Sequence, residues 1–390
     1  MKKVHKIRLE PTVKQLILFH KSAGVARFSY NWALAKWQEL YEAGEKTSEI
    51  SLRKQLNSIK RVEFPWMYEV SKTCPQQAIK NLGNAFSRFF KKTSKYPKFK
   101  KKGIHDSFRA DDGPGTFTIT ENRIKLSKIG SVKLSENLRF TGKLISATVT
   151  RRAKHWYVSV CIETEINPIT HENQGVVGVD LGIESLAVLS NSVVFENPNA
   201  LRRNLHKLKR IQRSASRKVK GSYNRKKAMQ AVASLHAKIY FLRQDSLHKL
   251  TTHLAKGFKT IVIEDLNVKG MVKNHHLAQA IFDCGFGEFR RQLTYKCQWY
   301  GSELVVADRF FASSKICSSC SFYYKGLTLN IREWTCPCCG TIHDRDYNAS
   351  KNLEQIGRVP PELTPVETEA LACNSVSETT VVEAGISPMA

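Results

Sequence analysis

Residues 175–182 read GVVGVDLG, a short apolar run that is bounded by glycines and carries a single carboxylate, Asp180. Such a run is typical of a strand buried inside an α/β fold. Because a hydrophobic interior does not tolerate an ionised carboxylate without a partner, a metal ion would be a suitable neighbour. The stretch therefore predicts a buried strand of a metal-binding domain.

Two later acids stand in similar positions. The β-branched run KTIVIED at 259–265 reaches Glu264, and in HDRDYNA at 343–349 Asp346 opens a helix. Carboxylates at two strand ends and one helix start are the hard oxygen ligands that Mg²⁺ or Mn²⁺ prefers. Two such ions about 4 Å apart can hold both the attacking water and the leaving oxygen of a phosphodiester. We therefore predict that Asp180, Glu264 and Asp346 are catalytic and bind two Mg²⁺ (or Mn²⁺) ions.

Each acid taken alone has an ordinary structural explanation. An Asp at a strand end is more often a helix cap or a turn former. The Asp180 strand would also fit the phosphate-binding strand of actin-like sugar kinases and ATPases. Such a kinase should carry a second glycine-rich phosphate loop, and the sequence has none, so a nuclease is the favoured interpretation.

The charge of the chain predicts a polyanionic partner. The net charge is +28 with a sequence pI near 9.8, which favours nucleic acid. The excess is uneven, since residues 358–390 carry a net charge of −4 and residues 1–357 therefore carry +32. No apolar run approaches the roughly 18 residues of a membrane span, and the N-terminus lacks an apolar signal core. We expect a cytoplasmic protein without membrane contact.

Four cysteines have the spacing of a zinc site. Cys317-x-x-Cys320 and Cys336-x-x-Cys339 are separated by fifteen residues, inside the range of a four-thiolate ribbon. Because thiolates fill all four positions, the single Zn²⁺ should be structural. Cys338 could replace Cys339, but the glycine that follows Cys339 suits the turn closing a knuckle, so Cys339 is preferred. The nearby histidine at 343 is expected to be a neighbour and not a ligand.

The first hundred residues predict a strand followed by helices. Residues 4–9 suggest a strand, and Thr12 with Gln15 forms a capping-box pattern at the start of a long helix. A second helix is expected to begin after Pro75, with amides and cations on the face opposite its apolar stripe. Amides can read base edges and cations can hold phosphates, although such a face is often only solvated. The nucleic-acid contacts predicted here and in the aromatic and lysine segment KYPKFK at 95–100 are Gln77, Lys80, Asn81, Asn84, Lys95, Lys98 and Lys100.

The remaining pattern divides into two regions. From 117 to 166 apolar residues alternate with period two, which predicts a small antiparallel barrel that the N-terminal strand could join. The helical segment 12–100 would then be an insertion into the barrel. After Asp180, strands at Ser185–Leu189, 193–195 and 304–308 alternate with helices near 201–213, 226–255 and 286–300. This alternation of strands and helices predicts a mixed sheet with helices on its faces.

Taken together, these motifs resemble the transposon-encoded TnpB family. The matching segments are IRLEPT at 7–12, RFSYNWAL at 27–34, KYPKFK at 95–100, GVDLG at 178–182, IED at 263–265, SSKICSSC at 313–320, WTCPCCG at 334–340 and HDRDYNAS at 343–350. The resemblance covers nearly the whole chain, to about residue 356. It implies an RNA-guided DNA endonuclease that is related to the ancestors of type V CRISPR effectors. The guide would be an omega RNA made from the transposon end, and the protein would recognise a short motif beside its double-stranded DNA target.

The resemblance also implies an architecture. It suggests an α/β RuvC-like nuclease domain with the RNase H fold at 173–310 and 343–357, and a zinc ribbon that binds target nucleic acid at 311–342. A wedge domain built as an OB-like β-barrel would comprise 1–11 and 103–172, with a helical recognition domain inserted at 12–102. By this likeness Asp180, Glu264 and Asp346 match the RuvC acids, Asp346 being preferred over Asp344 because it heads the DxNA pattern. The host would be a prokaryote.

Two rival functions remain open. A DNA strand-transfer transposase could use the same sheet, but its third acid is usually a glutamate on the last helix. A guided repressor could occupy DNA without cutting it, although the intact set of acids favours cleavage. Residues 358–390, which are acidic and rich in Pro, Thr and Ser, are expected to be disordered.

Overall fold

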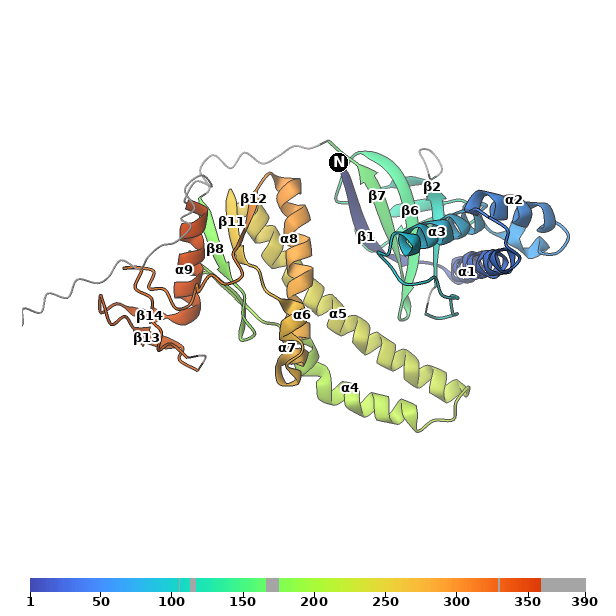
Figure 1. The fold of residues 1–390 in the computed structure, drawn as a ribbon. Coiled ribbons are helices and arrows are strands. Elements are labelled where there is room, and N and C mark those ends of the chain that lie inside the picture. Colours follow the sequence, from blue (N-terminus) through green and yellow to red (C-terminus); the bar gives the residue numbers. More distant parts are fainter. Residues whose placement is uncertain (105, 113–116, 166–174, 329, 359–390) are drawn as a thin grey trace, which may run out of the picture. The chain divides into compact units, whose positions relative to one another are not determined.

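The computed structural model describes residues 1–104, 106–112, 117–165, 175–328 and 330–358. The chain forms two compact units, one made of residues 1–166 and 210–237 and the other of residues 167–209 and 238–390 (Figure 1). The predicted disorder after residue 358 lies outside the described residues. No helix among those residues is long and apolar enough to cross a membrane.

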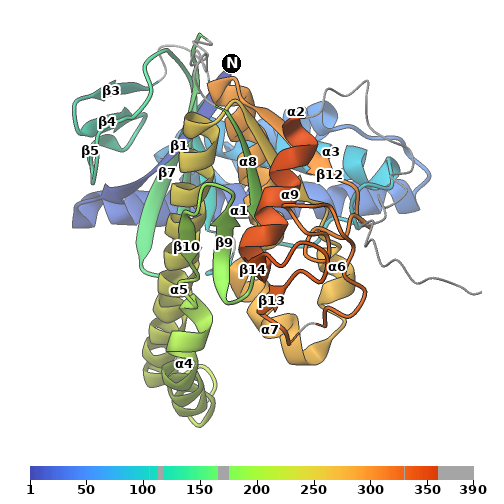
Figure 2. The same cartoon turned by 90° about the vertical axis from the view of Figure 1, so that its left-hand side faces the viewer.

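A seven-stranded antiparallel sheet forms the centre of the first unit. Its strands are β1 (Lys2–Glu10), β2 (Ser107–Asp112), β3 (Thr118–Thr120), β4 (Arg123–Leu126), β5 (Gly130–Leu134), β6 (Lys143–Arg152) and β7 (His155–Glu163). The order is β2-β6-β7-β1-β5-β4-β3, so the N-terminal strand joins this sheet as predicted. Leu9 pairs with Trp156 on one side and Leu134 on the other. Figure 2 shows β3, β4 and β5 together at one end of the sheet.

Helices fill the chain between β1 and β2, as expected for an insertion. They are α1 (Val13–Glu42), α2 (Glu49–Ile59), the 3₁₀ helix η1 (Pro65–Glu69) and α3 (Thr73–Phe90). The capping box at Thr12 is confirmed, because its side chain accepts from the Gln15 N–H while the Gln15 side chain accepts from the Thr12 N–H. Phe19 of α1 packs its ring 5.2 Å from that of Trp156 in β7, which fixes the helix to the sheet.

Three local predictions for this unit were wrong or incomplete. Helix α3 begins at Thr73 and not after Pro75, because proline is tolerated in a first turn whose N–H groups have no helical acceptor. Gln77 was expected on the exposed face but is only 5% exposed. Strand β2 was missed, although buried Phe108 and Ala110 alternate with their neighbours.

The second unit contains a five-stranded mixed sheet of order β10-β9-β8-β11-β12. Its strands are β8 (Val176–Asp180), β9 (Ser185–Leu189), β10 (Val194–Glu196), β11 (Thr260–Glu264) and β12 (Glu303–Ala307). β8, β9 and β10 form antiparallel neighbours, while β11 runs parallel to both β8 and β12. The GVVGVDLG stretch thus forms a buried strand, as predicted, and the structure places that strand in the middle of the sheet.

Helices cover both faces of this sheet. The chain supplies α4 (Ala200–Ser216), α5 (Tyr223–Gly257), α6 (Val268–Met271), α7 (His275–Cys284), α8 (Phe286–Tyr300) and α9 (Arg345–Arg358). Leu250 of α5 and Leu293 of α8 share a core with Val179 and Ile263, whereas Leu353 of α9 packs with Val262 on the opposite face. In Figure 1, α9 is drawn in red beside β8, with which it makes extensive contact. The short helices α6 and α7 were not predicted.

Gly178 in β8 explains how closely α9 approaches. A Cβ atom at this position would lie 1.9 Å from the carbonyl oxygen of Ser350 and 2.5 Å from the backbone nitrogen of Glu354. Since only glycine lacks that atom, the helix can lie against the strand backbone. The segment before α9 carries the short hairpin of β13 (Glu333–Thr335) and β14 (Ile342–Asp344).

Candidate functional site: a carboxylate cleft and a cysteine centre

The three predicted acids meet at one edge of the mixed sheet. Asp180 and Glu264 are the last residues of β8 and β11, and the register pairs Val179 with Ile263, one residue before each acid. Asp346 lies in the first turn of α9. Because parallel neighbours end at the same edge, these side chains line a single cleft of about 720 Å³. The cleft is also lined by Leu181, Gly182, Ile183, Glu184, Asn199, Arg202, Leu277, Ser313, Ser314, Arg332, Arg345 and Ala349.

The acids influence one another electrostatically. Burial raises the pKa of Asp180 well above its usual range, and the carboxylates of Glu264 and Asp346 raise it further. Burial also raises the pKa of Asp346. Among the described residues, the oxygens of these acids do not form a group as tight as the cysteine sulfurs, which all lie within 4.8 Å of one another. Repulsion among nearby carboxylates is the condition that a bound divalent cation relieves.

Two further polar side chains contact the acids and were missed in the sequence. Ser313 donates a hydrogen bond of 2.5 Å from its hydroxyl to Oε1 of Glu264. Arg332 lies 3.3 Å from Oδ1 of Asp346 and 3.4 Å from Oε2 of Glu184. Ser313 is the first residue of the SSKICSSC motif, so its position beside the first cysteine knuckle could have marked it as a candidate site residue. Arg332 precedes Trp334 by two residues, and no local pattern marked it.

Asp265 shows why Glu264, and not the acid after it, belongs to the cleft. Asp265 pairs with Arg290 of α8 and with Arg309 after β12. Hydrogen bonds from Arg309 and Arg290 lower the pKa of its carboxyl group. Its charge is therefore satisfied by protein cations, whereas Glu264 lines the cleft with Asp180.

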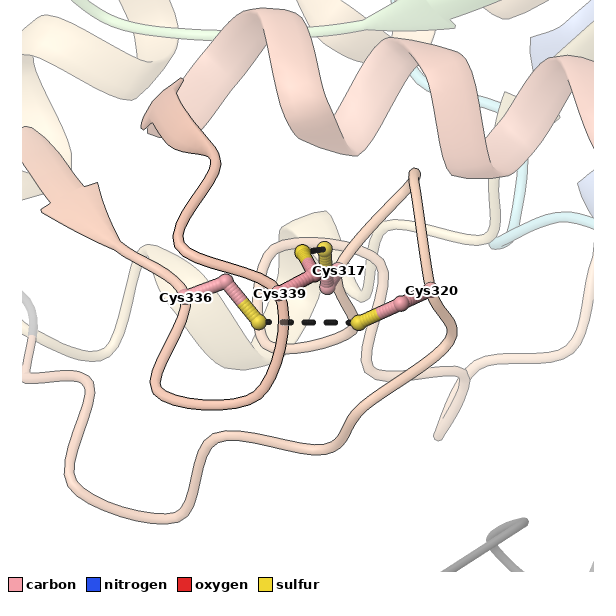
Figure 3. Close-up of side chains that lie close together, drawn as sticks. All are labelled: Cys317, Cys320, Cys336 and Cys339. Atoms are coloured by element: carbon pink, nitrogen blue, oxygen red, sulfur yellow. Dashed lines mark hydrogen bonds between the residues drawn. The ribbon is translucent and has the colours of Figure 1, made fainter. Parts of the chain in front are cut away.

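The four predicted cysteines come together as a second centre (Figure 3). The sulfur of Cys317 lies 3.7 Å from that of Cys339, and the sulfur of Cys320 lies 3.6 Å from that of Cys336. Four sulfurs arranged tetrahedrally about 2.3 Å from a Zn²⁺ ion would be about 3.8 Å apart. The cluster therefore fits a structural zinc ion, with Cys339 in the group of four as predicted.

Neighbouring side chains support the cysteine centre. Nε2 of His343 lies 3.0 Å from the sulfur of Cys317, which agrees with the prediction of a neighbour outside the group of four. Hydrogen bonds with Thr341 lower the pKa of Cys339 to about 6. The ring of Trp334 lies 4.8 Å from that of His343 and is buried. The donor set is thus a compact thiol cluster with its own small core.

Helix α9 joins the cysteine centre to the acid cleft. Asn348 donates to the carbonyl of Ile316 and accepts from the N–H of Ser318, at 2.7 and 2.9 Å. Asn352 donates to the carbonyls of Ser313 and Ile316 at 2.7 and 2.6 Å. The helix that carries Asp346 is therefore bonded to the first cysteine knuckle and to the loop that carries Ser313.

The structure separates the predicted nucleic-acid residues into groups. Lys80, Asn81 and Asn84 are exposed on α3, and Lys95 and Lys98 are exposed in the segment that follows. They remain predictions of contact.

Two of the predicted contacts differ from these. Gln77 is buried, so its amide does not lie on the exposed face. Lys100 is half-buried, with its ammonium 4.0 Å from the centre of the Tyr30 ring. We therefore expect the Lys100 side chain to pack against Tyr30 in the first place, and to contact nucleic acid only secondarily.

Comparison with protein families gives three matches along the chain. A family described as "Probable transposase" matches residues 159–275, and "Cas12f1-like, TNB domain" matches residues 286–353. A "Helix-turn-helix domain" matches residues 1–46. In the structure this last segment consists of strand β1 and helix α1, so it is not a helix-turn-helix here.

Two curated proteins that are similar to the chain have closely related descriptions. A "Putative RNA-guided DNA endonuclease" from Streptomyces pristinaespiralis is 40% identical over 363 residues, which are 92% of this chain and 90% of that protein. The "Putative RNA-guided DNA endonuclease InsQ" from Escherichia coli is 33% identical over 371 residues, 90% of this chain and 91% of the relative. Among solved structures, a Cas12f1–sgRNA–target DNA complex covers 91% of this chain and 98% of its own, with a TM-score of 0.55 at 13% identity. That likeness concerns the fold alone.

Proposed function

The chain belongs to the TnpB (OrfB) family of RNA-guided DNA endonucleases, and we propose that it cuts DNA by metal-assisted hydrolysis of a phosphodiester in the cleft of Asp180, Glu264 and Asp346. The observation that carries this proposal is the meeting of the three acids, which are far apart in the sequence, at one edge of the sheet. The raised pKa of Asp180 supports it, because carboxylates that repel one another favour a shared cation.

Divalent metal ions suit this donor set. Asp180, Glu264 and Asp346 would hold Mg²⁺ or Mn²⁺ through hard oxygen ligands, as predicted for two ions. When bound, the metals would supply an activated water and stabilise the charge on the leaving oxygen. The protein's own part is to place the carboxylates and to keep Glu264 oriented through the Ser313 hydroxyl.

Arginines supply the positive charge that a DNA strand needs at the cleft. Arg202, Arg332 and Arg345 line it together with the acids. Guanidinium groups can hold phosphate oxygens through two parallel hydrogen bonds. Arg332 contacts Asp346 and Glu184, and we propose that it turns to a phosphate of the DNA when metal ions neutralise those acids.

We further propose that the units have the family's domain roles. The strand order β10-β9-β8-β11-β12 supports a RuvC-like domain of the RNase H type at 173–310 and 343–357, with the ribbon at 311–342 fastened to α9. The seven-stranded sheet supports a wedge domain at 1–11 and 103–172, whose closure into a barrel remains part of the proposal. The helices between β1 and β2 would form the recognition domain at 12–102.

The proposed partners are an RNA and a DNA. An omega RNA from the transposon end would select double-stranded DNA by base pairing, while the protein holds the backbone and reads a short flanking motif. Lys80, Asn81, Asn84, Lys95 and Lys98 are exposed and are candidates for that reading. We expect this work to take place in a prokaryotic cytoplasm, at the nucleoid.

One experiment separates this function from its rivals. The full-length protein is purified with its copurifying RNA, the RNA is sequenced, and plasmids carrying the matching target and randomised flanking sequence are incubated with Mg²⁺. We expect cutting that requires the RNA and that Asp180→Ala abolishes. The control Asp245→Ala, which removes an acid of an exposed ion pair, should leave cutting unchanged. Strand-transfer products without RNA would indicate a transposase, and RNA-dependent binding without cutting would indicate a repressor.

A further inference from the structure

A long segment of the chain holds cations without acids. Residues 197–244 contain fourteen lysines and arginines and no aspartate or glutamate. The segment includes α4 and the first part of α5. Lysines and arginines on an ordinary solvated helix are interspersed with acids, so this composition indicates an anionic partner.

The cations are concentrated at the C-terminal end of α4. Arg210, Arg213, Ser214, Arg217 and Lys218 line a hollow of about 480 Å³. Arg213 and Ser214 follow Arg210 by three and four residues, and Arg217 follows these two by four and three, so the four side chains lie on one face. Arg210, Arg213 and Arg217 are exposed, and Lys218 is half-buried. The hollow therefore presents three guanidinium groups and an ammonium group on one side of the helix.

Arg225 of α5 prepares this helix end for an anion. The last carbonyls of a helix carry partial negative charge that would repel one. Nη1 of Arg225 donates to the carbonyls of Ala215, Ser216 and Lys218, at 3.3, 3.2 and 2.8 Å. The α4–α5 turn is thereby held in place, and its negative carbonyl end is neutralised from within the protein.

The lining cations have no acidic partner in the described part of the chain. None of Arg210, Arg213, Arg217 and Lys218 takes part in an ion pair there, and the nearest acids in the sequence are Glu196 and Asp245. Like charges three and four residues apart on a helix repel one another. An arrangement that brings them together around a hollow is stabilised when an anion enters.

We propose that this hollow binds backbone phosphates of the guide RNA. The inference rests on the proposed function, since it takes the RNA to be the guide. Folded RNA has a narrow, deep major groove that brings phosphates of two strands close together. A cluster of guanidinium forks suits such paired phosphates better than single point charges do.

The test compares two sets of substitutions that remove the same charge. The site variant is R210Q/R213Q/R217Q, and the control is K220Q/K226Q/K227Q, which removes three exposed cations from the neighbouring turn and α5 outside the hollow. A third variant, R210K/R213K/R217K, keeps the positive charge but removes the guanidinium groups that can donate two parallel hydrogen bonds. Affinity of each full-length protein for the copurifying guide RNA, transcribed in vitro, is measured by filter binding at several salt concentrations. Circular dichroism and thermal melting check that each variant folds.

We expect the affinity of the site variant for the RNA to fall by about tenfold or more and its salt slope to fall by about two to three, roughly one for each phosphate that is no longer neutralised. The affinity of the control should fall by less than about threefold by the same reasoning, and the lysine variant should lie between. Equal decreases in site and control variants would overturn the proposal in favour of a diffuse positive field. A decrease confined to duplex DNA of the same length would overturn it in favour of a DNA site. If the wild type bound no RNA at all, the proposed function itself would fail.

Discussion

Asp180 determines how the acid cleft responds to pH. Its pKa is raised by burial, Glu264 and Asp346, so the folded protein binds a proton more tightly there than the unfolded chain does. This group therefore destabilises the metal-free fold increasingly as pH rises from the unfolded pKa, about 4, to the raised value. The same carboxylates that lower the stability of the metal-free fold at neutral pH also attract cations to the cleft.

We predict that Asp180→Asn stabilises the metal-free protein at pH 7. The expected rise in Tm is about 2–4 °C, which corresponds to about 1 kcal/mol for a unit of this size. The difference should shrink as pH falls toward 4 and vanish below it, where the wild-type group is protonated in both states. Mg²⁺ should raise the Tm of the wild type and leave the variant unchanged, as followed by scanning calorimetry. A variant that melts lower than the wild type at pH 7 would contradict this account, and Asp245→Asn serves as the control.

The hydroxyl of Ser313 should tune metal binding through Glu264. Removing it in Ser313→Ala frees the carboxylate that it orients, and removal of such a supporting bond typically costs about 10- to 100-fold in metal affinity. We expect the Mg²⁺ concentration for half-maximal cutting to rise by about tenfold on this basis. Ser314→Ala is the matched control, since Ser314 lines the same cleft and makes no side-chain hydrogen bond within the described residues. Equal effects of the two changes would show that Ser313 has no special role.

Sequence reasoning succeeded for residues whose place follows from strand geometry. Asp180 and Glu264 end parallel strands, so their meeting could be predicted without coordinates. Ser313 could not be assigned to Glu264, because a loop conformation decides that contact. The prediction that Gln77 is exposed was wrong for a related reason. Helical spacing gives the face on which a residue lies, but the packing of α3 decides how wide the buried face is.

At the scale of elements, the contact of α9 with β8 positions the third acid. Gly178→Ala would place a methyl group 1.9 Å from the Ser350 carbonyl oxygen. The helix would have to move, and overpacking of this kind typically costs about 1–3 kcal/mol. We expect lower stability in urea unfolding, together with slower cutting because Asp346 moves with the helix. Gly175→Ala is the control, since a Cβ there meets nothing within 4 Å; a variant at 178 as stable as that control would refute the argument.

The cysteine centre should stabilise the hairpin of β13 and β14 and, through Asn348 and Asn352, the start of α9. A zinc chelator, or Cys336→Ser, should therefore lower the Tm and expose Trp334, which is buried beside His343. The fluorescence change should vanish in Trp334→Phe, which distinguishes this tryptophan from the other five. One zinc per chain is expected by elemental analysis. Unchanged fluorescence after zinc is removed would show that the ribbon folds without the metal.

Elements with strong periodicity were predictable and short ones were not. The five strands of the mixed sheet include three that are buried apolar runs, and α5 and α8 carry long regular patterns. Helix α7 has ten residues and is ended by Gly285 at φ 73°, yet its apolar face is too short to stand out from a loop. Strand β2 was hidden because its pairing partner β6 lies about forty residues away in the sequence, and only that pairing makes it a strand.

For the whole molecule, the distribution of charge governs binding. The chain carries +28 overall, while residues 359–390 contain five glutamates and no lysine or arginine, so the remainder carries +33. A protein that holds a guide and its target by their backbones releases counterions in proportion to the phosphates it contacts. Affinity should therefore depend on salt far more than on the sequence of the guide-paired region.

We predict that affinity for guide RNA, and for target DNA once the guide is bound, falls by about 10³-fold or more between 50 and 200 mM salt, as expected for six or more phosphate contacts. The logarithm of affinity should fall linearly with the logarithm of salt concentration, measured by filter binding at constant Mg²⁺. A chain ending at residue 358 should keep the same slope and bind somewhat more tightly, because it loses only negative charge. If affinity were nearly independent of salt, the positive charge would not be used for binding nucleic acid, and a guided mechanism would lose its physical basis.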